Sequence, residues 1–235
     1  MDLLKNLKKE LKKNSNKNKA KILQKFFKTG QGEYGEGDIF LGLTVPQSRK
    51  IAKKYSNLDI SAINSLLDSK IHEERLIALL ILVENYQSSN DEQKYKIINF
   101  YLQNAKNINN WDLVDLTADK ILGNYLINKP KDILYSLANS ENLWEKRISI
   151  ISTFHFIKNN FFEDAFKISK ILINDKHDLI HKAVGWMLRE VGKRNKKELQ
   201  KFLNENYKIM PRTTLRYAIE KFPEKQRQAY LKGGI

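Results

Sequence analysis

Cysteine is absent from this chain of 235 residues, and proline is scarce, with only four residues. Without a thiol the chain can form neither disulfides nor thiolate metal sites, and it has no cysteine nucleophile. No apolar run approaches the roughly 18 residues that cross a bilayer, and the first residues lack the apolar core of a signal peptide. We therefore expect a soluble, cytoplasmic protein with no membrane partner.

The sequence motifs of metal, nucleophile and cofactor sites are also missing. The four histidines form no His-Glu-x-x-His zinc motif, and there is no Gly-x-Ser-x-Gly nucleophile motif. We expect neither a metal nor a cofactor. Any chemistry would then use carboxylate, arginine and indole side chains.

Acidic side chains are in the minority: the chain has 42 Lys and Arg residues but only 27 Asp and Glu residues, which gives a net charge of +15. Such an excess favours a polyanionic partner through long-range attraction and counterion release, with nucleic acid as the first candidate. Because 34 of the basic residues are lysine and only eight are arginine, the positions of the arginines carry more weight than the total. The lysines between residues 5 and 21 fit a DNA-facing arm, and equally a solvated helix face.

Nearly every segment has the spacing of an amphipathic helix. Between residues 71 and 86, Leu76 and Leu79 recur on one face while Glu73 and Glu74 fall on another. Strict period-two alternation is absent, and short polar connections separate the segments. We expect an all-α helical-repeat solenoid, one domain over residues 1–235, whose concave side accepts a long ligand such as a duplex. Further helices are expected over 2–13, 17–28, 46–55, 59–68, 111–121, 131–138, 142–158, 162–173, 177–193, 196–206, 211–222 and 224–231.

The glycine-rich segment 29–38 departs from this helical pattern. It is predicted to be a loop, since each glycine costs about 1 kcal/mol in a helix interior. A phosphate cradle is one interpretation, but the segment lacks the Lys-Ser/Thr ending of a P-loop and its carboxylates would repel phosphate. We favour a structural role, or the positioning of a neighbouring helix. After it, Thr44 is predicted to cap a helix that has Pro46 in its first turn and Gln47 completing the cap.

The three tryptophans each have a charged neighbour on the same helical face. Trp111 lies four residues before Asp115, and Trp144 lies three residues before Arg147. An indole beside a charge suits a nucleic acid, whose sugars and bases stack while its phosphates bind cations. The alternative is burial of the indoles in the core. Arg147 either pairs with a carboxylate such as Asp115 or clamps a phosphate.

The third tryptophan is the centre of a basic stripe. Four residues share one face of the helix predicted over 177–193: Lys182, Trp186, Arg189 and Lys193. The opposite, apolar face is expected to form the core. Because a basic stripe around an indole has no use in packing, we expect this face to bind DNA. The candidate DNA-binding residues are Lys182, Arg189, Lys193, the adjacent Arg194, and Arg212 and Arg216 on a later helix.

Four ordered segments resemble the AlkD-like DNA alkylation repair proteins, a family of helical-repeat DNA glycosylases. The resemblance runs from about residue 26 to residue 222 and implies a concave basic groove of HEAT-like repeats that holds duplex DNA. It also implies hydrolysis of the N-glycosidic bond of N3- or N7-alkylated purines without flipping the lesion into a pocket. The segments are Trp-Asp-Leu-Val-Asp at 111–115, Asn-Leu-Trp-Glu-Lys-Arg at 142–147, His-Lys-Ala-Val-Gly-Trp-Met-Leu-Arg-Glu at 181–190 and Met-Pro-Arg-Thr-Thr-Leu-Arg-Tyr-Ala-Ile-Glu-Lys at 210–221.

The resemblance also implies a role for each matching residue. Asp115 matches the catalytic carboxylate, Trp111 and Trp186 match the indoles around the sugar of the damaged nucleotide, and Arg147 matches the arginine beside them. An N-alkylated purine is already cationic and leaves without a general acid, so the remaining barrier is the oxocarbenium-like sugar. We expect a monomeric, monofunctional alkylpurine DNA glycosylase that acts at the nucleoid of a bacterial-type cytoplasm. A non-catalytic helical-repeat scaffold is the alternative, and a metal-dependent nuclease is a distant third.

Overall fold

The computed structural model describes residues 3–234, and its regular elements in that range are all helical. The β-type contact among the described residues is a single isolated parallel bridge between Ile39 and Ile71. The predicted all-α class is therefore confirmed. None of the described helices combines the length and the apolar character needed to span a membrane.

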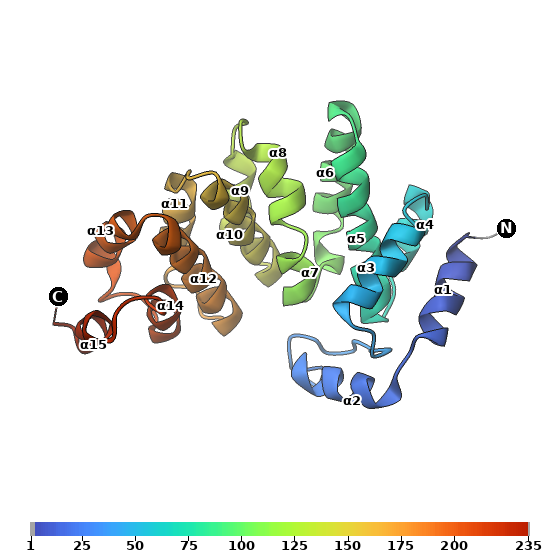
Figure 1. The fold of residues 1–235 in the computed structure, drawn as a ribbon, viewed down its shortest axis with the longest axis horizontal. Coiled ribbons are helices and arrows are strands. Elements are labelled where there is room, and N and C mark those ends of the chain that lie inside the picture. Colours follow the sequence, from blue (N-terminus) through green and yellow to red (C-terminus); the bar gives the residue numbers. More distant parts are fainter. Residues whose placement is uncertain (1–2, 235) are drawn as a thin grey trace. The chain divides into compact units, whose positions relative to one another are not determined.

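The chain divides into two compact units, residues 1–117 (unit 1) and residues 118–235 (unit 2), so that one domain over the whole chain stays a prediction. Unit 1 contains α1 (Leu3–Lys13), α2 (Lys17–Phe26), α3 (Val45–Lys54), α4 (Ile60–Leu67), α5 (His72–Ser88), α6 (Asp91–Gln103) and α7 (Trp111–Asp115) (Figure 1). Unit 2 contains a π-helical segment (Asp119–Gly123), α8 (Asn124–Leu126), α9 (Asp132–Ala138), α10 (Leu143–Lys158), α11 (Glu163–Leu172), α12 (Asp178–Arg194), α13 (Lys196–Asn206), α14 (Arg212–Ala218) and α15 (Glu224–Lys232).

Helix α5 is the core of unit 1, where it packs against α3, α4, α6 and α7. Every side chain from His72 to Val83 is buried, so the polar face predicted for this helix is wrong at Glu73 and Glu74, while the third predicted member, Glu84, is exposed. Glu73 is 2 % exposed, and its carboxylate accepts the backbone N–H groups of Leu41, Gly42 and Leu43 at 2.7 to 3.2 Å. The buried carboxylate is thus hydrogen-bonded by a loop that is distant in sequence. Helix periodicity alone does not reveal such a contact.

The glycine-rich segment is a loop, as predicted, and backbone contacts tie its end to the start of α5. The backbone N–H of Ile39 donates to the Lys70 carbonyl, and the N–H of His72 donates to the Ile39 carbonyl, both at 2.9 Å. Gly42 has φ of +89°, a conformation that side chains with a Cβ rarely adopt. Beyond it, the predicted start of α3 is confirmed, because Thr44 and Gln47 form a reciprocal capping box.

The helix predicted over residues 111–121 is interrupted. Helix α7 ends at Asp115, and the next helical segment is the π-helical turn that begins at Asp119. The hydroxyl of Thr117 donates to the Leu113 carbonyl at 2.6 Å. The Tyr101 hydroxyl lies 3.0 Å from the Thr117 hydroxyl. The Thr117 hydroxyl thus occupies the carbonyl that a continuing helix would offer to the Thr117 backbone N–H, and that N–H bonds the Val114 carbonyl instead, at 3.1 Å.

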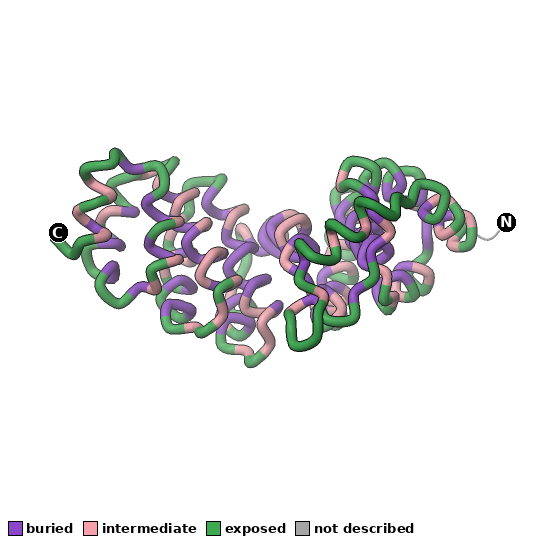
Figure 2. The backbone as a smooth tube through the Cα atoms, turned by 90° about the horizontal axis from the view of Figure 1, so that it is seen from below, coloured by how far each residue is buried: buried purple, intermediate pink, exposed green. Residues whose placement is uncertain are grey.

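Unit 2 repeats one packing pattern, in which a long buried helix contacts the helices before and after it. Helix α10 packs against α9, α11 and α12, and α12 packs against α11, α13 and α14. Helix α10 is buried without a break from Arg147 to Thr153, whereas α12 has a buried face and a partly exposed one; Figure 2 shows the backbone coloured by burial. This is the predicted arrangement of stacked helix pairs. All the apolar residues expected in the core of α12 are buried: Ile180, Val184, Met187, Leu188 and Val191.

Candidate active site

The short helix α7 carries Trp111 and Asp115 at its two ends. The helix begins after Asn110, whose side-chain oxygen accepts the backbone N–H of Trp111 at 2.8 Å. Both Trp111 and Asp115 are partly exposed, and their separation of four residues sets them on the same helical face. An indole and a carboxylate therefore share one accessible face of unit 1.

The indole of Trp111 rests on a stack of aromatic rings. It lies parallel to Phe27, with 5.1 Å between ring centroids and 14° between ring planes. Phe26 meets the same indole edge-on at 5.9 Å. On the inner side, Phe27 stacks on Phe40 at 5.0 Å, and Phe40 stacks on the imidazole of His72 at 4.5 Å. Such contacts fix ring orientation as well as burying apolar area.

Beneath these rings lies a buried ionic network that sequence analysis missed. His72 is 2 % exposed, and its two ring nitrogens face two carboxylates: Nε2 is 2.8 Å from Asp112 and Nδ1 is 3.3 Å from Asp38. Arg75 donates from Nη2 to both carboxylate oxygens of Asp38 at 2.7 Å. Asn110 also donates to Asp38, at 3.3 Å. The signal in the sequence is the run from His72 to Arg75 at the start of an otherwise apolar helix.

The ionisation of this network follows from its geometry. Burial lowers the pKa of His72, but the carboxylates of Asp112 and Asp38 outweigh burial and raise the pKa to about 9, above the ordinary value of 6.5. Burial raises the pKa of Asp38, but the hydrogen bond from His72 and the charge of Arg75 leave that pKa below its usual value. At neutral pH the network therefore contains an imidazolium and a carboxylate.

In unit 2, Trp186 is partly exposed on α12 and contacts two other side chains. Its indole N–H donates to Glu190 at 3.1 Å, and its ring lies 5.7 Å from the ring of Phe154 on α10. Glu190 also accepts Lys193 at 2.7 Å. Glu190 follows Trp186 by four residues, so the spacing could have predicted this contact.

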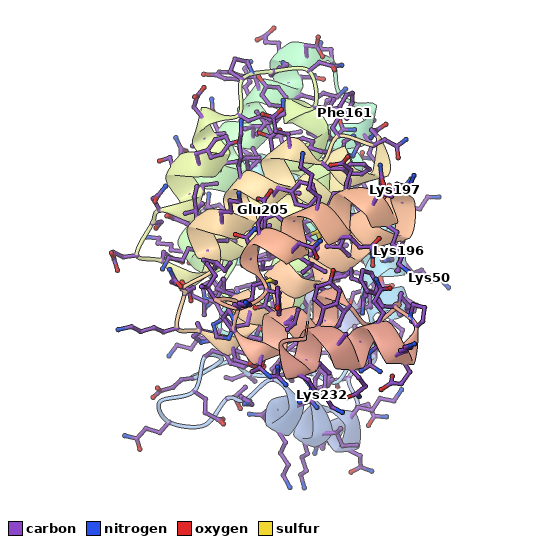
Figure 3. All side chains as sticks on the ribbon, turned by 90° about the vertical axis from the view of Figure 1, so that its left-hand side faces the viewer. Lys50, Phe161, Lys196, Lys197, Glu205 and Lys232 are labelled. Carbon is purple, nitrogen blue, oxygen red and sulfur yellow. The ribbon has the colours of Figure 1, made fainter. Side chains whose placement is uncertain are left out.

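The predicted basic stripe lies on α12, and the two further candidates Arg212 and Arg216 lie on α14, which packs against α12. Several of its members already have partners within unit 2: Lys182 pairs with Asp178 at 2.7 Å, and Arg189 pairs with Glu220. Arg212 donates to the carbonyl of Leu231 at 2.7 Å, while Arg194 and Arg216 are exposed. Further exposed lysines project from neighbouring helices of unit 2, and Figure 3 shows Lys196, Lys197 and Lys232.

Arg147 and Trp144 are buried in unit 2, at 4 % and 8 % exposure. The guanidinium of Arg147 donates to the carbonyl of Leu179 at 2.5 Å and so ties α10 to the first turn of α12. Sequence analysis missed this backbone contact. For Trp144 the alternative interpretation, a core tryptophan, is correct. Trp111 and Asp115 belong to unit 1 while Arg147 and Trp186 belong to unit 2, and their convergence stays a prediction.

The family model described as DNA alkylation repair enzyme matches residues 7–222, which covers most of both units. The chain belongs to the DNA alkylation repair enzyme family. This membership confirms the resemblance noted in the sequence and gives the protein a role in DNA repair. No curated protein matches the sequence.

The fold of this DNA alkylation repair family member is shared with a solved structure. The structure is described as a predicted DNA alkylation repair enzyme from Enterococcus faecalis, and it superposes with a TM-score of 0.69. The alignment covers 89 % of this chain and 97 % of the other, at 16 % sequence identity. At this identity the likeness shows the helical-repeat fold.

Proposed function

We propose that this protein is a monofunctional DNA glycosylase that hydrolyses the N-glycosidic bond of N3- or N7-alkylated purines in duplex DNA. The observation that carries the proposal is that Asp115 and Trp111 lie on one accessible face of α7, in a member of a DNA alkylation repair family. The lesion would stay in the duplex, and no cofactor would be required.

The chemistry needs little more than a positioned carboxylate. The alkylated purine carries a positive charge and departs without a proton donor, which leaves an oxocarbenium-like sugar in the transition state. A carboxylate about 4 Å from that cation, at an effective dielectric of about 20, contributes roughly 4 kcal/mol. This corresponds to about a thousandfold in rate. Asp115 would also orient the water that attacks the sugar.

The remaining residues would bind the substrate. Trp111 and Trp186 would place indole faces beside the sugar, with cation–π contacts of about 0.5 to 2 kcal/mol. Arg147 would lie beside these indoles, and its guanidinium also holds the first turn of α12, the helix that carries Trp186. Phosphate contacts would come from the basic residues of α12 and α14: Lys182, Arg189, Lys193, Arg194, Arg212 and Arg216.

The proposal is tested by incubating the protein with a duplex that contains a single 7-methylguanine and separating the products by chromatography. We expect free 7-methylguanine to appear faster than spontaneous depurination, in the presence or absence of EDTA. The DNA strand should stay intact until the abasic site is cleaved with alkali. Binding of the duplex without base release would contradict the proposal and favour a non-catalytic scaffold, and strand cleavage that EDTA abolishes would favour a nuclease.

A further inference from the structure

Unit 1 contains a buried ionic network that the proposed reaction does not use. Its members come from three segments of the chain: Asp38 from the end of the glycine-rich loop, His72 and Arg75 from α5, and Asp112 from α7. All four side chains are buried, with exposures of 2 to 7 %. Burying ion pairs in a protein interior has a large desolvation cost, so stability alone is a weak reason for this network.

His72 connects to α7 through the network. Its Nε2 lies 2.8 Å from Asp112, the second residue of α7, and the other oxygen of Asp112 accepts the N–H of Leu113 at 2.9 Å. The contact therefore fixes the backbone of the helix that carries Trp111 and Asp115.

His72 also connects to Trp111 through aromatic rings. The imidazole stacks on Phe40 at 4.5 Å and lies 5.1 Å from Phe27, and Phe27 lies flat against the indole of Trp111. The same imidazole is thus connected to the α7 backbone through Asp112 and to the indole through Phe27.

The charge balance explains why a protonated imidazole suits this position. A protonated ring donates from both nitrogens and can bond Asp38 and Asp112 together, whereas a neutral ring donates from only one. Two carboxylates face one guanidinium and one imidazolium, so the network is neutral as a whole. Replacing His72 by a neutral side chain leaves one carboxylate without compensation in the interior.

We propose that His72 is a positioning residue, whose imidazolium, held between Asp38 and Asp112, sets the orientation of Trp111 and Asp115 on α7. The effect on base release rests on the proposed glycosylase function. The effect on the Trp111 indole does not, and it can be measured in the absence of DNA.

The test uses the full chain labelled with 5-fluorotryptophan, with the three ¹⁹F resonances assigned through Trp→Phe variants. We expect His72→Gln, and separately Asp112→Asn, to shift or broaden the Trp111 resonance while those of Trp144 and Trp186 stay in place. The matched control is Glu73→Gln, which also removes a buried charge of α5, one whose carboxylate bonds the backbone of Leu41, Gly42 and Leu43 rather than Asp112. It should leave the Trp111 resonance unchanged.

Base release gives a second readout. His72→Gln should lower the single-turnover rate roughly ten- to a hundredfold, as expected for a displaced catalytic group, with little change in duplex affinity. Glu73→Gln should retain the rate. If the wild type releases no base, the proposed function fails while the fluorine resonances still test the positioning role.

An unchanged Trp111 resonance in folded His72→Gln, or an equal shift in Glu73→Gln, would overturn the proposal. If His72→Gln does not fold, a pH titration of the labelled wild type tests the positioning role instead. We expect the Trp111 resonance to titrate with a midpoint near the His72 pKa of about 9, while the helical circular dichroism stays constant. A resonance that does not move between about pH 7 and about pH 10 would overturn the proposal as well.

Discussion

The indole of Trp111 lies parallel to the ring of Phe27, with 5.1 Å between centroids and 14° between planes. Phe27 is the residue that follows α2, and it is 7 % exposed. The orientation of a partly exposed indole is therefore set by a buried ring at the C-terminal end of a different helix. In the proposed reaction this support keeps the indole face available to a cationic sugar.

Replacement of Phe27 by leucine is predicted to lower the rate of base release about tenfold, because Trp111 loses its flat support. A matched control is Phe202→Leu in unit 2, since Phe202 is 5 % exposed and stacks on Phe166 at 4.9 Å and 15°. Both variants should lose about 1 kcal/mol of unfolding free energy. Single-turnover kinetics and urea unfolding provide the two measurements. Equal rates for the two variants would argue against a role for the Phe27 support.

Arg189→Ala is predicted to weaken duplex binding and to reduce the slope of log K against log salt by about one unit, the effect of one lost phosphate contact. In the free protein this guanidinium is paired with Glu220. Glu220→Gln should therefore strengthen binding by removing the competing carboxylate. Arg227→Ala is the control, because Arg227 pairs with Glu224 in a similar way on α15. A slope that is the same in Arg189→Ala as in the wild type would contradict this placement.

The stability of the protein is predicted to fall at alkaline pH through the deprotonation of His72. The pKa in the folded state is about 9, above the ordinary value of 6.5, so the contribution is complete below about pH 6.5 and is lost as the pH rises through 9. A shift of this size corresponds to roughly 3 kcal/mol. The unfolding free energies of wild type and His72→Gln, measured in urea, should differ most at about pH 6 and become similar at about pH 10. A constant difference across that range would be inconsistent with a buried imidazolium.

Gly185→Ala is predicted to destabilise unit 2. A Cβ at this position of α12 would lie 2.6 Å from the carbonyl oxygen of Thr214 and 2.5 Å from Cβ of Tyr217, both on α14. We expect a loss of about 1 to 3 kcal/mol of unfolding free energy. Gly192→Ala is the control with a smaller expected loss, since its Cβ would meet a side-chain methyl of the buried Leu199 at 2.4 Å rather than a backbone atom, and the gain in helix propensity of up to about 1 kcal/mol offsets part of the cost. Equal unfolding free energies for the two variants would contradict close α12–α14 packing.

The helices were predictable because burial of one face repeats along the sequence with the period of the helix. The core face of α12 and the cap of α3 agree with that expectation, as they depend on residues close together in the chain. Helix α5 was predicted with a polar face because Glu73 and Glu74 are charged. Their burial depends on distant partners, since Glu73 accepts backbone N–H groups of the loop before α3 and Glu74 pairs with Lys8 of α1 at 3.1 Å.

The candidate site was predictable in part. The spacing of Trp111 and Asp115 indicated a shared face, since four residues make about one helical turn. The network of Asp38, His72 and Asp112 joins three segments separated by more than thirty residues each, and no local pattern records such contacts. The bond from Arg147 to the carbonyl of Leu179 likewise joins two helices distant in sequence.

The most direct test of the proposed mechanism is the single-turnover rate of 7-methylguanine release by Asp115→Asn, measured beside Asp91→Asn. Asp91 is an exposed residue in the first turn of α6, so its variant makes the same change of charge away from α7. We predict that Asp115→Asn is slower than the wild type by roughly a thousandfold while its melting temperature and duplex affinity change little. Asp91→Asn should keep the wild-type rate. Base release by Asp115→Asn at the wild-type rate would contradict the assignment of Asp115 as the catalytic carboxylate.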